Sequence, residues 1–107
     1  MGDASTSIAH FDSVLRILKD LESHKIALYE HQYQPQVFGG FVLVLGHTHD
    51  RVRFSWDGRE FILSISFGTF PNKNASAAWT HDADISLPNG HGLYEEISSH
   101  AAQMLAI

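Results

Sequence analysis

Cysteine is absent from this chain of 107 residues, and basic side chains and long apolar runs are scarce. Without cysteine the protein has no disulfide, no iron–sulfur cluster and no thiol nucleophile, and nothing in it requires an oxidising compartment. The N-terminal residues lack a basic start followed by an apolar core, so they do not resemble a secretory leader, and no later run is long enough to span a membrane. We therefore expect a cytoplasmic protein that does not bind membranes.

Lysine and arginine together number 7 against 12 acidic residues, which gives a formal net charge of −5. A nucleic-acid surface needs a cluster of basic side chains because phosphate contacts dominate its affinity, and the sequence contains no such cluster. The charge therefore argues against DNA or RNA and favours a partner with a basic surface. The 8 histidines are the one unusual feature of the composition.

Between residues 41 and 67, apolar residues alternate with polar ones, and two turn signals interrupt the pattern. This predicts three neighbouring antiparallel strands, of which the first is apolar on both faces and therefore internal. Asp57-Gly58 in the second turn is typical of a two-residue hairpin loop. The cross-strand pairs that follow from such a loop are Trp56 with Arg59, Phe54 with Phe61 and Val52 with Leu63.

Apolar residues recur at helical spacing near both ends of the chain and predict helices at residues 7–23 and 92–105. Residues 1–6 are small and polar, and we expect them to be frayed. A strand is expected at residues 25–33. The polar stretch 72–84 is interpreted as a long loop that ends in a short edge strand at residues 85–87.

These elements predict one α+β domain spanning residues 1–107. Its order is a helix, an antiparallel sheet of four or five strands in meander order, and a second helix, with both helices packed on one face. The first helix is expected to cover the sheet with an apolar stripe that comprises Ile8, Phe11, Val14, Leu15, Leu18 and Leu21. The alternative fold is a strongly curved sheet wrapped around one helix, with a cone-like pocket for a small ligand.

Gly46-His47-Thr48-His49-Asp50, at the end of an apolar strand, is the sharpest local pattern. Two imidazoles and a carboxylate can bind a divalent metal such as zinc, with further ligands from His81, Asp82 and Asp84. The Gly-His-x-His run resembles the last metal-binding segment of the calcineurin-like phosphoesterases, which implies a two-metal hydrolase. The earlier Asp-x-His, Gly-Asp and Gly-Asn-His segments of that family are missing, so we do not assign the family. The same residues are also typical of a plain hairpin loop.

Two helices cover only one face of such a sheet, so we expect an exposed apolar remainder that includes Phe41 or Leu43 and Ile62. A second copy of the chain would cover this remainder, which predicts a homodimer. The residues expected to bind a ligand or partner are Tyr33, Phe41, Trp79 and His81.

The leading hypothesis is a small acidic cytosolic binding protein, without catalytic activity or cofactor, that engages a protein partner or itself. The alternative is a metal- or small-ligand-binding protein, or a hydrolase, that uses His47, His49 and Asp50 with His81. Convergence of these side chains in one concave pocket would favour the alternative, whereas histidines splayed on a hairpin tip would favour the binding protein.

Overall fold

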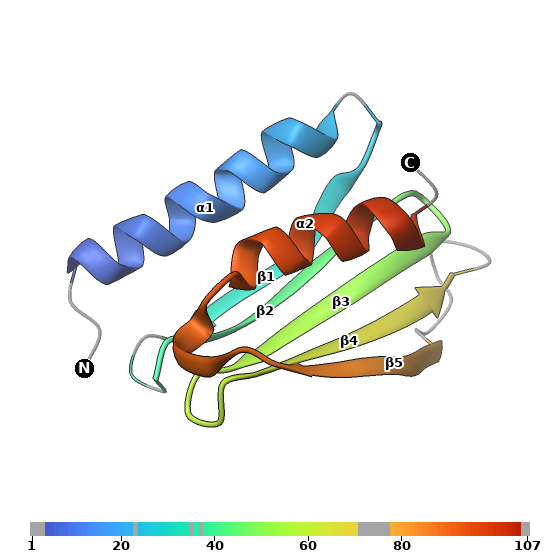
Figure 1. Ribbon diagram of the computed structural model, residues 1–107. Coiled ribbons are helices and arrows are strands. Elements are labelled where there is room, and N and C mark those ends of the chain that lie inside the picture. The colour runs from blue at the N-terminus through green and yellow to red at the C-terminus, as the bar shows by residue number, and fades with distance from the viewer. Residues whose placement is uncertain (1–3, 23, 35, 37, 71–77, 106–107) are drawn as a thin grey trace.

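The computed structural model describes residues 4–22, 24–34, 36, 38–70 and 78–105. Five strands form one antiparallel sheet in the order β1-β2-β3-β4-β5, and both long helices lie on one face of it (Figure 1). This confirms the predicted meander between two flanking helices. Neither of these helices, over the residues described, is both long and apolar enough to cross a membrane. The elements are α1 (Ala4–Glu22), β1 (Ala27–Gln34), β2 (Gly40–Gly46), β3 (Asp50–Asp57), β4 (Ile62–Thr69), β5 (Ala78–Ser86), the short helix η1 (Pro88–Gly90) and α2 (Leu93–Met104).

The core lies between the helices and the central strands. Alternate residues of a strand point to the same face, so one set of side chains on β2, β3 and β4 faces the helices. Leu43 lies opposite Phe54, Phe54 lies opposite Ile65, and all three are completely buried. The helices cover them with apolar side chains that are themselves buried, namely Val14, Ile17 and Leu21 from α1 and Leu93, Ile97 and Ala101 from α2.

The β3–β4 hairpin has the predicted faces, but the predicted register was wrong. Asp57 Oδ1 accepts hydrogen bonds from the backbone N–H groups of Arg59 at 2.9 Å and Glu60 at 3.1 Å, which stabilises a longer turn over residues 58–61. The register moves by an even number of residues, so the side chains that remain on β3 and β4 stay on their predicted faces, whereas Arg59 and Phe61 lie in the turn. The observed pairs are Val52 with Phe67, Phe54 with Ile65 and Trp56 with Leu63.

Two predicted element boundaries were also wrong. α1 begins at Ala4, three residues before the predicted start at residue 7. β5 spans Ala78–Ser86, so Trp79 and His81 lie on a strand of 9 residues and not in a long loop. An edge strand has a neighbour on one side only, so it tolerates polar side chains that resemble a loop in the sequence. Residues 72–77 of the expected loop, and 1–3 of the expected frayed end, lie outside the described residues.

The apolar stripe of α1 is wider than the surface beneath it. Val14 and Leu21 are buried as predicted, but Ile8, Phe11 and Leu15 remain 67%, 50% and 51% exposed. The reason is the place of the helix, because α1 contacts β1, the first strand of the sheet, and only one side of its apolar arc has a sheet below. The predicted stripe therefore divides into a buried half and an exposed half.

Gly58 permits the β3–β4 turn to touch the chain just before β2. A Cβ built on Gly58 would collide with the backbone carbonyl of Phe38, whereas a Cβ on Gly92 would meet no atom within 4 Å, although the φ of Gly92 is 76°. We expect Gly58→Ala to lower the free energy of unfolding by about 3 kcal/mol, because one backbone segment must move. Gly92→Ala should lower the free energy of unfolding by about 1 kcal/mol, because alanine is disfavoured in the left-handed conformation of this residue but meets no steric obstacle. Urea unfolding measures both, and equal effects of the two substitutions would contradict this packing.

Candidate functional site

The loop between β2 and β3 carries two histidines whose side chains bond to different parts of the chain. His47 Nε2 lies 3.2 Å from the carbonyl oxygen of Leu105, which follows α2, and His49 Nδ1 lies 2.8 Å from the carbonyl oxygen of Phe70, which follows β4. Each ring N–H donates to the carbonyl it reaches, so both histidines fasten the loop to neighbouring segments. This is the splayed arrangement that favours the binding protein over the metal site.

The other predicted metal ligands lie on β5 and form a small polar pair of their own. His81 Nε2 lies 2.9 Å from Asp84 Oδ1, and Ser64 is the cross-strand partner of Asp84. Hydrogen bonds from His81 and then from Ser64 lower the pKa of the Asp84 carboxyl. Within the described residues, no group of three or more His, Cys, Asp or Glu side chains is arranged to hold a metal ion. The structure therefore does not bring His47, His49, Asp50 and His81 together.

In the described part of the chain, no helix lies over the other face of the sheet, which we call the uncovered face, and most of its side chains are polar. Arg53 lies 4.6 Å above the ring of Trp79, and Arg51 lies between the rings of Tyr29 and Phe70, at 3.8 and 4.1 Å. A guanidinium over an aromatic face is held there by cation–π attraction. A hollow of about 500 Å³ lies on this face, lined among others by Glu30, Val42, Arg53, Ser66, Trp79 and His81. The predicted binding residues Trp79 and His81 thus share one surface.

The other two predicted binding residues, Tyr33 and Phe41, lie opposite each other on the face that the helices cover. Both rings contact His10, which is buried on the inner side of α1: Tyr33 stacks on it at 4.2 Å and Phe41 tilts toward it at 4.6 Å. His10 Nδ1 lies 2.7 Å from the hydroxyl of Tyr94 on α2, and His10 Nε2 lies 2.9 Å from His31 Nε2 on β1. Each of these two contacts is a hydrogen bond with one hydrogen between the two atoms. His10 of α1 is therefore bonded both to α2 and to the sheet.

Burial changes the acid–base properties of the cluster formed by His10, His31 and Tyr94. It lowers the pKa of His10 from 6.5 to about 4, with a further contribution from the nearby His31, and it also lowers the pKa of His31. Burial, followed by the neighbouring Tyr33, raises the pKa of Tyr94 to about 12. At neutral pH the cluster is therefore uncharged. The sequence contained one signal for it, since His10 stands four and seven residues before the buried Val14 and Ile17 and so occupies a core position of the helix.

The exposed half of the α1 stripe lies on the flank of the helix next to β1. The ring of Phe11 packs edge-on against His31 and Tyr33 of that strand, with centroid separations of 5.4 and 5.5 Å. Among the residues that the structure describes, β1 has a hydrogen-bonded neighbour on one side only, β2. We call this surface the α1–β1 edge and define it as Ile8, Phe11 and Leu15 of α1 with Leu28, His31 and Tyr33 of β1. The predicted apolar remainder on the sheet was wrong for Phe41 and Leu43, which are buried, whereas Ile62 is half-buried.

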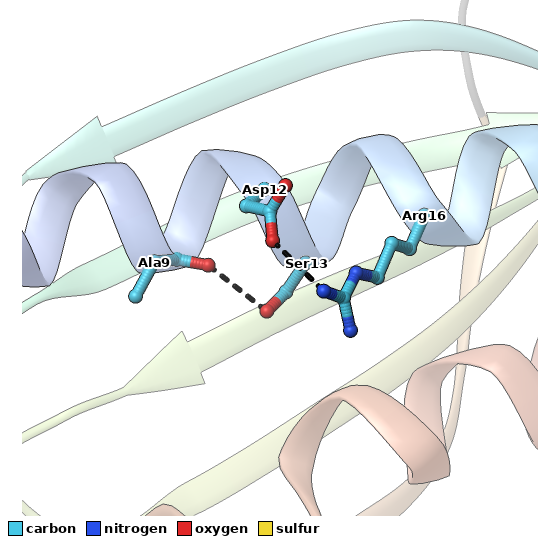
Figure 2. Close-up of polar contacts among 4 residues, drawn as sticks. All are labelled: Ala9, Asp12, Ser13 and Arg16. Atoms are coloured by element: carbon cyan, nitrogen blue, oxygen red, sulfur yellow. Dashed lines mark hydrogen bonds and ion pairs between the residues drawn. The ribbon is translucent and has the colours of Figure 1, made fainter.

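The flank of α1 that faces α2 is polar. Figure 2 shows the ion pair between Arg16 and Asp12, 3.3 Å apart, and the hydroxyl of Ser13, which donates to the carbonyl oxygen of Ala9 at 2.9 Å. A hollow of about 530 Å³ separates this flank from α2, and its lining includes Arg16, Asp20, Glu95, Ser98 and Ala102. The two flanks of α1 therefore differ sharply in polarity.

The lowered pKa of His10 predicts a loss of stability in acid. Above pH 6.5 His10 is unprotonated in both the folded and the unfolded chain. Between pH 6.5 and about 4 His10 binds a proton in the unfolded chain but not in the folded one, so the free energy of unfolding decreases as the pH falls through this window. The titratable groups that face His10 are His31 and Tyr33 of β1 and Tyr94 of α2.

Between pH 7 and 4.5 we expect His10 to account for a loss on the order of 2 kcal/mol in the free energy of unfolding. His10→Gln, which keeps a hydrogen-bonding side chain but does not titrate, should flatten this part of the profile. His24→Gln at an exposed position is the control and should not. Urea unfolding across this pH range measures the effect, and an equally steep profile for His10→Gln would show that His10 is not its source.

Comparison with protein-family models, with curated proteins and with solved structures finds no match for this chain. Its function must therefore be inferred from its own surfaces. In the described part of the chain, the α1–β1 edge combines exposed apolar side chains with a strand that has no neighbour on its outer side.

Proposed function

We propose that this protein is a non-catalytic binding protein that works as a homodimer, in which the α1–β1 edges of two copies meet. The observation that carries the proposal is the exposed apolar flank of α1 beside β1, whose outer edge has no neighbouring strand among the described residues. Contiguous apolar surface of this kind is typical of protein interfaces, and an open strand edge is a template for pairing with another strand.

The spacing of the apolar side chains suits a second copy of the same surface. Ile8 precedes Phe11 by three residues and Leu15 follows it by four, so the flank is nearly symmetrical about Phe11. When two copies meet about a two-fold axis, Phe11 faces its own counterpart and Ile8 faces Leu15 of the other copy. Each of these side chains then loses much of its exposed area, which stabilises the pair by on the order of 1 kcal/mol per side chain.

Pairing of the strands adds a directional component to the same contact. The two-fold axis brings the two β1 strands together in antiparallel orientation, and the two sheets then form one continuous sheet. All four long helices lie on one side of that sheet, and the polar faces with Arg51, Arg53 and Trp79 lie on the other. The proposed dimer therefore leaves both uncovered faces open.

The opposite edge of the sheet, which β5 forms, is less suited to self-association. β5 carries Asp82 and Asp84 on a strand of 9 residues, and like charges across a symmetrical strand pair repel. The large hydrophobic side chains that are exposed in the described part of the chain belong to α1, to β1 or to the turns at Phe38 and Phe61, and none belongs to β5. This contrast between the two edges favours β1.

The expectations of a cytosolic location and of partners other than nucleic acid accompany this proposal, and they rest on the composition of the chain. The alternative of a metal site is less well supported, because His47 and His49 each bond to the backbone of a different segment. A metal would have to break both hydrogen bonds to use these rings.

Sedimentation equilibrium tests the homodimer. At micromolar concentration we expect a species of twice the chain mass of 11.9 kDa. Phe11→Asp places a carboxylate at the centre of the interface. The dissociation constant of the dimer should rise about 100-fold, because that charge is buried without a partner. Arg16→Glu introduces a carboxylate on the polar flank of the same helix and should leave the dimer intact.

Circular dichroism should show the same secondary structure for the wild type and both variants. A monomeric wild type at micromolar concentration would exclude the homodimer. If Arg16→Glu dissociated the protein and Phe11→Asp did not, a different surface of α1 would join the two copies.

A further inference from the structure

A third hollow of the molecule is walled by aromatic rings. It lies between the N-terminal half of α1, the start of α2 and the turns at one end of the sheet, and its volume is about 320 Å³. This is at the small end of the range of ligand sites, so it suits a molecule of one or two rings. We call it the aromatic pocket, and the rings that line it belong to Tyr33, Phe38, Phe41, Trp56, Phe61 and Tyr94.

The lining of the aromatic pocket carries no formal charge at neutral pH. None of its described lining residues is Asp, Glu, Lys or Arg, and its one histidine, His10, is buried and neutral. The other two large hollows differ, since Arg16 and Asp20 line the one between the helices, and Glu30 and Arg53 line the one on the uncovered face. An uncharged apolar site excludes charged ligands because they would lose their hydration without compensation.

A few polar atoms at the base of the pocket can orient a ligand. Both ring nitrogens of His10 are already engaged, by the Tyr94 hydroxyl and by His31. The hydroxyl oxygen of Tyr94 has two lone pairs and one proton, so it retains the capacity to bond once more. The hydroxyl of Tyr33 lies near the same pocket, 3.9 Å from the position that a Cβ on Gly39 would take. The site thus offers apolar walls and hydroxyl groups.

The rim of the pocket holds unusual backbone conformations. Phe38 and Phe61 have φ angles of 53° and 56°, and Asn89 has a φ of 58°. The left-handed region is unfavourable for bulky side chains and costs on the order of 1 to 2 kcal/mol. Phe38 is also 67% exposed, so burial of its ring does not compensate for this cost. Strain of this kind concentrates at ligand sites, and here it holds two phenyl rings at the mouth of one pocket.

We propose that the aromatic pocket binds a small, flat, uncharged aromatic molecule that carries one hydroxyl or N–H group, as phenols do. Its ring lies among Phe41, Trp56 and Tyr94, and its polar group exchanges a hydrogen bond with a tyrosine hydroxyl. Phe38 and Phe61 cover the outer side of the ring. The aromatic pocket shares Tyr33 with the α1–β1 edge, but Ile8, Phe11 and Leu15, whose contacts form the proposed homodimer, do not line it.

The probe for the test is p-cresol, with p-toluate as its matched control, since p-toluate has the same ring and methyl group but a carboxylate in place of the hydroxyl. In ¹H–¹⁵N spectra of the full chain, p-cresol should shift the indole N–H signal of Trp56 in a saturable way. The indole signal of Trp79, on the uncovered face, should stay in place. p-Toluate at the same millimolar concentrations should shift neither signal.

Substitutions on two helices link the signal to the pocket. Ala9→Leu adds bulk to the pocket from α1 and should raise the dissociation constant of p-cresol about tenfold. Ala102→Leu adds the same bulk to the hollow between the helices and should leave that constant unchanged. Phe38→Ala removes an exposed ring from the rim, so this variant should fold normally and should also bind p-cresol more weakly. It keeps the test valid if Ala9→Leu does not fold.

Three results would overturn the proposal. The first is the absence of a saturable shift of Trp56 with p-cresol. The second is an equal response to p-toluate, which would mean that the site accepts a charge. The third is a binding constant for p-cresol that neither Ala9→Leu nor Phe38→Ala changes.

Discussion

Leu43, Phe54 and Ile65 lie side by side across β2, β3 and β4 and are completely buried under the helices. This burial decides the rest of the structure, because a strand that buries one set of alternate residues must present the other set to the opposite face. Arg51, Arg53 and the serines of β4 therefore face away from the helices. α2 contacts the central strand β3, and α1 is left to pack over β1 at the end of the sheet.

The place of α1 accounts for both surfaces on which function is proposed. Because only part of its apolar arc has a sheet beneath it, Ile8, Phe11 and Leu15 stay exposed beside the edge strand β1. On the inner side, the same helix holds His10 between Tyr94 and His31, and the rings around this contact form the walls of the aromatic pocket. One helix position thus creates an apolar outer flank and an uncharged inner pocket.

The fold was predictable from the sequence because alternation with period two and helical spacing are local patterns. Local patterns did not place Trp79 and His81 on a strand, because the polar edge strand β5 resembles a loop in the sequence. The register of the β3–β4 hairpin was not predictable in this way, because it depends on how Asp57 caps the turn. The roles of His47 and His10 were not predictable either, since their partners Leu105 and Tyr94 lie 58 and 84 residues away in the chain.

The central claim is that a second copy of this chain covers the exposed flank of α1. An isotope-filtered NOE experiment on a mixture of labelled and unlabelled protein observes that contact directly, since it records proton pairs that belong to different copies. The account predicts intermolecular cross-peaks between the Phe11 rings of the two copies and between Ile8 and Leu15. Cross-peaks that arise from the uncovered sheet face instead, or a sample without any at millimolar concentration, would contradict it.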